Sequence, residues 1–123
     1  MKFIDQKQLD ELSVIDPPGV KINDERSELR KVILLFVEHS KKWGDDLLSA
    51  YTNHDREKLA HVAHNFRASA SYVGAHEVVA LCLNLETSAL TATFDQIRRL
   101  IELIQTASRE ANHELIAWIQ ASQ

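Results

Sequence analysis

The feature that most constrains the fold of this chain is an apolar residue at every third or fourth position over long segments. This spacing puts the apolar side chains on one stripe of an α-helix, which has about 3.6 residues per turn. The longest stripe consists of Phe94, Ile97, Ile101, Ile104, Ala107 or Ser108, Ala111, Leu115 and Trp118. Because the 123 residues include only three glycines and two prolines, strands joined by tight turns are not expected. The pattern predicts an all-α protein.

A strong helix breaker separates the first two predicted helices. A short helix is expected over residues 5–15, opened by Asp5 and Gln8 in a pattern that resembles a capping box. The run Asp16-Pro17-Pro18-Gly19 ends it, because proline cannot continue a helix. A long second helix is expected from residue 23 or 24 to about residue 50.

The third predicted helix carries the candidate site. It is expected to follow an N-cap at Asn53 and to stop at Gly74, since glycine suits the left-handed residue after a helix. On a helical wheel one side is apolar and consists of Leu59, Val62, Phe66, Ala70 and Val73. His64 lies opposite this side and is therefore predicted to face water.

Two further helices complete the predicted architecture. The fourth is expected over residues 76–90, with Val79, Leu83 and Leu90 on its buried side. Thr93 and Gln96 form a capping box that opens the fifth. Four long amphipathic helices with short connections predict an antiparallel four-helix bundle, with the short N-terminal helix packed on one end. We expect one domain over residues 1–123.

Small and basic side chains surround His64 on the exposed face of its helix. The neighbours within about 60° on the wheel are Glu57, Ala60, His61, Arg67, Ala68 and Ser71, of which Ala60, Ala68 and Ser71 are small and Arg67 is an adjacent cation. A reachable imidazole with small neighbours and one adjacent cation suits a nucleophile whose charged product docks against another protein. An exposed histidine on a helix is also ordinary, so the wheel proposes a site without establishing it.

Charge and apolar content exclude several classes of partner. The net charge is −4 without a block of like charge, so nothing indicates nucleic-acid binding. The longest apolar run, residues 32–37, is far short of the roughly 20 residues that span a bilayer. Cys82 is the only cysteine and cannot form an internal disulfide, which fits a reducing cytosol. We expect a cytoplasmic monomer without membrane contact.

The segment from His64 to Ala75 resembles the signature of the histidine-containing phosphotransfer (HPt) family, commonly H-x-L-K-G-S-(S/A)-x-x-(V/L/I)-G-(A/L). The direct matches are His64, Ser69, Ala70, Val73, Gly74 and Ala75. Phe66 and Arg67 are apolar and basic replacements, and Ala68 stands where most members have glycine. The run Leu81-Cys82-Leu83-Asn84-Leu85-Glu86 is similar to the family's helix ending in Leu-Glu. The resemblance implies a four-helix bundle with an added N-terminal helix.

The resemblance also implies a function, that of a phosphorelay intermediate. His64 would accept a phosphoryl group from an aspartate of a receiver domain and pass it to a response regulator. Arg67 would stabilise charge on the phosphoryl oxygens. The implied contact surface for the partner consists of Ala60, His61, Ala68 and Ser71.

The implied partners are receiver domains of a hybrid sensor kinase, of response regulators, or of both. They would supply Mg²⁺, so no cofactor or metal is expected on this chain. Because the sequence has no ATP-binding motif, a carrier is expected and not a kinase.

Two other functions stay open at this point. The replacements at Arg67 and Ala68 allow a binding module that docks on receiver domains without transferring phosphate. A metal-binding helical bundle would use His61 and His64 on one face, with His54, His76 and Cys82 as further candidate ligands. However, the histidine pair lacks the Glu-x-x-His partners of di-iron bundles and the paired cysteines of zinc modules.

Overall fold

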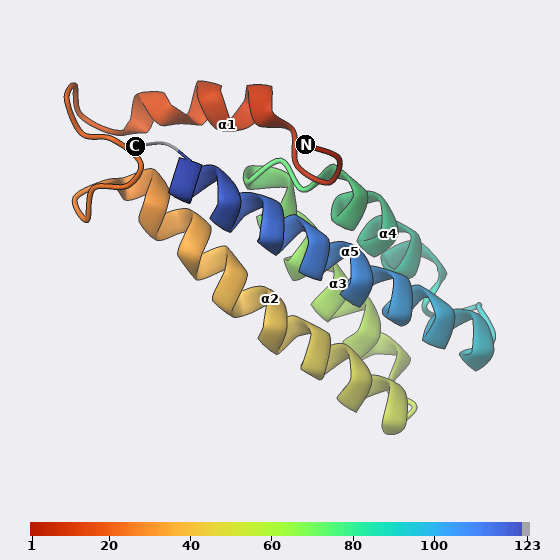
Figure 1. The fold of residues 1–123 in the computed structure, drawn as a ribbon. Coiled ribbons are helices and arrows are strands. Elements are labelled where there is room, and N and C mark those ends of the chain that lie inside the picture. The colour runs from red at the N-terminus through yellow and green to blue at the C-terminus, as the bar shows by residue number, and fades with distance from the viewer. Residues whose placement is uncertain (122–123) are drawn as a thin grey trace.

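A computed structural model describes residues 1–121, and every regular element within that range is helical. The helices are α1 (Gln6–Leu12), α2 (Glu28–Thr52), α3 (Arg56–Tyr72), α4 (His76–Ser88) and α5 (Phe94–Ala121), with a short 3₁₀ turn, η1 (Ser13–Ile15), after α1 (Figure 1). The predicted all-α class is confirmed.

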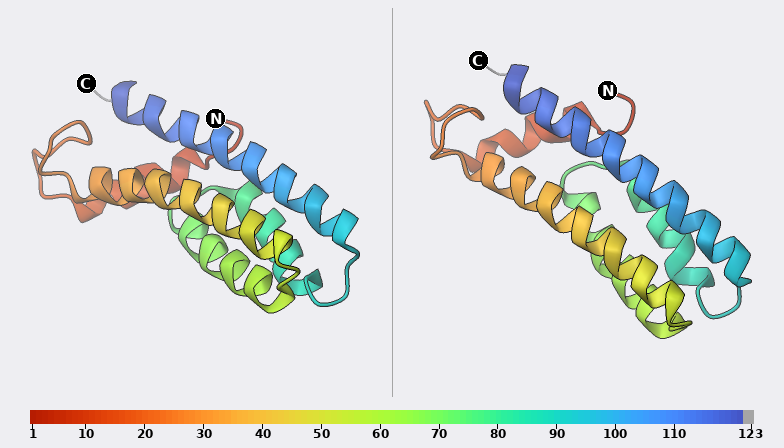
Figure 2. Two further views of the ribbon diagram at one scale, coloured as in Figure 1. Left: turned by 90° about the horizontal axis from the view of Figure 1, so that it is seen from below. Right: turned by 60° about the horizontal axis from the view of Figure 1, so that its bottom comes forward.

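The four long helices form a closed ring. Helix α3 packs between α2 and α4, and α5 closes the ring by packing against both α2 and α4 (Figures 1 and 2). The core is built from the apolar stripes, as shown by Phe66 of α3, whose ring centroid lies 5.2 Å from that of Trp43 and 6.3 Å from that of Phe36. The predicted antiparallel four-helix bundle with an additional N-terminal helix is confirmed.

Helices α2 and α5 are much longer than α3 and α4. Their 25 and 28 residues correspond to about 37 Å and 42 Å, whereas α3 and α4 have 17 and 13 residues. One end of the α2–α5 pair therefore extends past the other two helices, and α1 lies there (Figures 1 and 2). Leu9 and Ile4 are buried at this end. The Glu114 carboxylate of α5 holds the segment before α1 by accepting the N–H groups of Phe3 at 2.9 Å and Ile4 at 3.0 Å.

The N-terminal segment is also joined to the end of α3. The N–H of Asp5 donates to the carbonyl of Gly74 at 2.9 Å, and Gln8 Nε2 donates to the carbonyls of Ser71 at 2.7 Å and Tyr72 at 3.1 Å. Gly74 has φ +77°, so the predicted glycine stop is confirmed. Asp5 caps α1 as predicted, but the Gln8 side chain binds α3, so the reciprocal half of a capping box is absent.

The predicted start of α2 was wrong by several residues. Helix α2 begins at Glu28 with Ser27 as its N-cap. Asp16, from the predicted breaker, supplies a second cap by accepting the backbone N–H of Glu28 at 2.6 Å. Asp24 instead lies in a turn and pairs with Arg26 at 2.7 Å, a contact that lowers the pKa of Asp24 to about 2. The local Ser27 cap and the tertiary contact from Asp16 together set this helix start.

The start of α3 also differs from the prediction, whereas the start of α5 agrees with it. Asp55 is the N-cap of α3 and accepts the N–H of Lys58 at 3.0 Å, while Asn53 ends α2. The capping box of α5 is confirmed. Thr93 Oγ1 accepts the N–H of Gln96 at 3.1 Å, and Gln96 Oε1 accepts the N–H of Thr93 at 3.0 Å.

The buried side of α4 was predicted incorrectly. The helix buries Val78, Cys82 and Leu85, while Val79 is half-buried and Leu83 and Leu90 are exposed. Apolar residues occupy nearly every side of this helix, so the three-four rhythm fits more than one orientation. Packing between α3 and α5 decides the orientation, and it leaves leucines in water.

Candidate functional site

His64 lies in the middle of α3, on the side opposite the core. The predicted core residues of this helix are all buried, and they are Leu59, Val62, Phe66, Ala70 and Val73. The His64 side chain is 54% exposed, as the helical wheel predicted. Its nearest polar neighbour across the helix boundary is Glu86 of α4.

Glu86 joins the two side chains predicted to act at the site. Its Oε1 lies 2.7 Å from Nδ1 of His64, and its Oε2 accepts from Nε of Arg67 at 2.7 Å. The hydrogen bond from Arg67, with a smaller effect from His64, lowers the pKa of Glu86, and the same bond raises the pKa of Arg67. Glu86 is therefore an ionised carboxylate at neutral pH.

These contacts define which ring nitrogen of His64 carries the proton. Nη2 of Arg67 also lies 3.2 Å from Nδ1 of His64, but a guanidinium can only donate, and Nδ1 cannot both donate to Glu86 and accept from Arg67. The shorter contact joins Nδ1 to an ionised acceptor, so we assign the proton of the neutral ring to Nδ1. The lone pair then lies on Nε2, which has no hydrogen-bond partner among residues 1–121.

The remaining predicted site residues lie on the accessible side of α3. His61, Ala68 and Ser71 are exposed, and Ala60 is half-buried. Because Arg67 contacts α4, helix geometry places Ala60 on the α4 side of His64 as well, whereas His61 and Ala68 lie toward α2. His61 also contacts Asn65 at 3.3 Å between Nε2 and Nδ2.

Glu86 is the site residue that sequence reasoning missed. It belongs to a helix otherwise rich in apolar residues, between Leu83 and Leu90 on the same side. A charged residue within such a stripe was the available signal. The helical wheel of α3 could not reveal it, because the contact joins side chains 22 and 19 residues apart.

The histidines and the cysteine do not gather into a ligand set. Within residues 1–121, no three His, Cys, Asp or Glu side chains come together in a way that could hold a metal ion. Cys82 is buried, and this burial raises the pKa of its thiol to about 12. In the same range no helix combines the length and apolar character needed to cross a bilayer.

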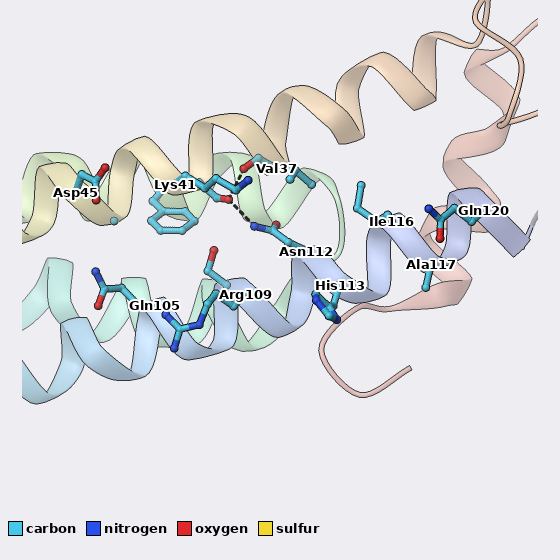
Figure 3. A pocket seen from close by; sticks show the side chains of 14 residues that line it. Val37, Lys41, Asp45, Gln105, Arg109, Asn112, His113, Ile116, Ala117 and Gln120 are labelled. Atoms are coloured by element: carbon cyan, nitrogen blue, oxygen red, sulfur yellow. Dashed lines mark hydrogen bonds between the residues drawn. The ribbon is translucent and has the colours of Figure 1, made fainter.

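A groove with a volume of about 780 Å³ lies away from His64, between α2 and α5. Figure 3 shows Gln105 and Asn112 of α5 reaching toward α2, where Asn112 Nδ2 donates to Ser40 Oγ at 2.8 Å. Phe66 contributes to its lining from α3, on the side opposite His64. The groove and the exposed imidazole are therefore separate features.

Comparisons with known proteins agree with this architecture. The sensor protein TorS of Escherichia coli (strain K12) is 28% identical over 80 residues, which make up 63% of this chain and 9% of TorS, so the chain spans a small part of that relative. The crystal structure of histidine-containing phosphotransfer protein B (HptB) from Pseudomonas aeruginosa PAO1 shares the fold, with a TM-score of 0.84 over 99% of this chain and 98% of that chain at 22% identity. The model of the Hpt domain family matches residues 31–111. Because this match covers more than half of the sequence, the chain belongs to the Hpt domain family.

Proposed function

We propose that this chain is a cytoplasmic phosphorelay intermediate that carries a phosphoryl group on His64. It would take the group from the aspartyl phosphate of one receiver domain and give it to an aspartate of a response regulator. The observation that supports this role best is the His64 ring itself, which is 54% exposed and bound through Nδ1 to Glu86. This arrangement leaves Nε2 with the lone pair that a nucleophile requires.

The proposed transfer of the phosphoryl group to His64 needs no proton acceptor on this chain. The Nε2 lone pair forms a bond to phosphorus while the bond between phosphorus and the aspartate oxygen breaks, and the aspartate leaves as a carboxylate with the electron pair. The imidazole becomes positively charged as the new bond forms. Glu86 lies 2.7 Å from Nδ1 and stabilises this charge through a charge-assisted hydrogen bond. Delivery to the next aspartate reverses these changes.

Arg67 would serve both Glu86 and the phosphoryl group. Its Nε and Nη2 face the Glu86 carboxylate at 2.7 and 3.5 Å, while a guanidinium has five N–H donors in all. The donors not directed at Glu86 are available to phosphoryl oxygens. The small exposed side chains of Ala68 and Ser71, with those of Ala60 and His61, would let the receiver approach closely. The receiver would bring the Mg²⁺, and this chain would act as a carrier without kinase activity.

A His64→Gln variant tests the proposal. The wild type should gain an acid-labile label from a phosphorylated receiver domain, and His64→Gln should gain none while keeping its helical circular dichroism spectrum. His113→Gln is the matched control, because it changes an exposed histidine of α5 that lines the separate groove between α2 and α5 and should keep the label. A label retained by His64→Gln would refute the assignment. A receiver that binds the wild type tightly without labelling it would favour a docking module.

A further inference from the structure

Two exposed leucines flank Glu86, Leu83 within α4 and Leu90 two residues past its end at Ser88. Leu83 is 45% exposed and Leu90 is 65% exposed. They lie three residues before and four residues after Glu86, which places all three on one side of the helix. The chain keeps a helical path beyond Ser88, because the N–H of Ala92 donates to the carbonyl of Ser88 at 2.8 Å. Leu90 therefore stays in line with the other two.

These leucines lie near Glu86, whose carboxylate contacts the His64 ring. With a rise of about 1.5 Å per residue, Leu83 and Leu90 lie about 4.5 Å and 6 Å along α4 from Glu86. The Glu86 carboxylate touches the His64 ring. A protein that brings a reactive phosphorus atom to Nε2 of His64 therefore comes close to the part of the surface that carries both leucines.

The other flank of His64 is different in character. On the α2 side of the ring, the exposed side chains of α3 include His61 and Asn65, which contact each other. Toward α4 the surface around His64 therefore carries two exposed leucines beside the Arg67–Glu86 pair, whereas toward α2 it carries the polar His61 and Asn65 beside Ala68. An uneven surface of this kind imposes one orientation on a partner, since apolar area is stabilised only by apolar area.

We propose that Leu83 and Leu90 anchor the receiver domain that exchanges phosphate with His64, and that this receiver presents aliphatic side chains to them. The inference rests on the proposed function, because the occupant is the protein that reaches His64. Single exposed leucines are common and need no explanation, and Leu48 of α2 is one example at 42% exposure. Leu83 and Leu90 differ because they lie near the surface that a phosphate donor must approach.

The test compares Leu83→Ser, Leu90→Ser and the double variant with Leu48→Ser. Leu48 is a matched control because it lies on the side of α2 that faces α5. It follows Gly44 by one turn, and Gly44 faces Gln105 of α5. The phosphodonor is a purified receiver domain that labels the wild type. The receiver concentration for half-maximal transfer should rise about tenfold in the double variant, while the rate at saturation stays unchanged. Leu48→Ser should behave as the wild type.

Labelling by phosphoramidate separates failure of this inference from failure of the proposed function. This small donor needs no docking surface, so it should label His64 equally in all four leucine variants. A wild type that phosphoramidate labels but no receiver labels would overturn the proposed function. A double variant that transfers with the wild-type concentration dependence would overturn only the anchor. The anchor would also be overturned if the wild type forms a dimer in analytical ultracentrifugation and the double variant does not, while transfer stays unchanged. The leucines would then contact a second copy of this chain.

Discussion

Removing the Glu86 carboxylate should change both the tautomer of His64 and the rate of phosphotransfer. Glu86→Ala deletes the acceptor 2.7 Å from Nδ1 of His64 and the partner of Arg67. Without an acceptor at Nδ1, the proton is free to move to Nε2, where it blocks the lone pair. Glu86→Gln is the milder change, because an amide oxygen can still accept from Nδ1 but carries no charge.

The expected size of the effect follows from the type of hydrogen bond. A hydrogen bond to a charged group contributes about 1.5–3 kcal/mol, which corresponds to roughly a ten- to 150-fold change in rate. The His64 ring is 54% exposed, so water screens the interaction and the lower end applies. We expect Glu86→Ala to slow transfer about tenfold and Glu86→Gln to slow it less.

Two measurements check this prediction together. Rapid-quench transfer from a phosphorylated receiver gives the rate, and ¹⁵N NMR of the His64 imidazole gives the protonated nitrogen. In the wild type, the Nδ1–H form should dominate at neutral pH. Glu77→Ala is the control, because Glu77 is an exposed carboxylate in the first turn of the same helix and should leave both readouts unchanged.

The transfer rate and the NMR tautomer together show which part of the reasoning about Glu86 would be incorrect. If Glu86→Ala keeps both the wild-type rate and the Nδ1–H form, the assignment of the proton from the 2.7 Å contact is incorrect. If the rate falls while the Nδ1–H form persists, Glu86 acts by stabilising the charged ring or by holding Arg67, and not by placing the proton.

Three further predictions concern other parts of the molecule. Arg67→Ala should lower the rate of transfer at saturating receiver more than it weakens receiver binding in calorimetry, and weaker binding with an unchanged saturating rate would assign Arg67 to docking alone. Asp16→Ala removes the second cap of α2 and should lower the free energy of unfolding in urea by about 1 kcal/mol, with little effect on labelling by phosphoramidate. The Cys82 thiol has a pKa of about 12 when folded and 9.0 as the reference value, so the unfolded chain loses this proton first as pH rises. Stability should therefore fall by about 1.4 kcal/mol from this group between pH 8 and pH 10, and Cys82→Ala should lack that part of the decline in urea unfolding.

The fold was predictable because apolar stripes report which side of each helix is buried. The prediction from apolar spacing was wrong where the stripe was ambiguous, and the predicted helix start was wrong where a cap came from elsewhere in the chain. In α4 the apolar residues occupy nearly all sides, so Leu83 was expected inside and lies outside. At the start of α2 the N–H of Glu28 is capped by Asp16, a residue 12 positions earlier, and local spacing does not encode such a contact.

The candidate site was predictable only along α3. The wheel identified His64 as exposed and placed Arg67 beside it, because both belong to one helix. Glu86 belongs to another helix, and its importance comes from packing between α3 and α4. The tautomer of His64 could not be inferred either, since it depends on that same contact.

The ties between the N-terminal segment and the bundle affect where this protein can be shortened. The family pattern covers residues 31–111, but the Asp16 cap of α2, the Gln8 bonds to the end of α3 and the Glu114 carboxylate all lie outside it. A fragment trimmed to residues 31–111 would keep His64, Arg67 and Glu86. It would lose these bonds and the buried side chain of Leu9. We therefore expect a fragment limited to residues 31–111 to be less stable than the full chain, and useful fragment boundaries to lie outside both ends of that segment.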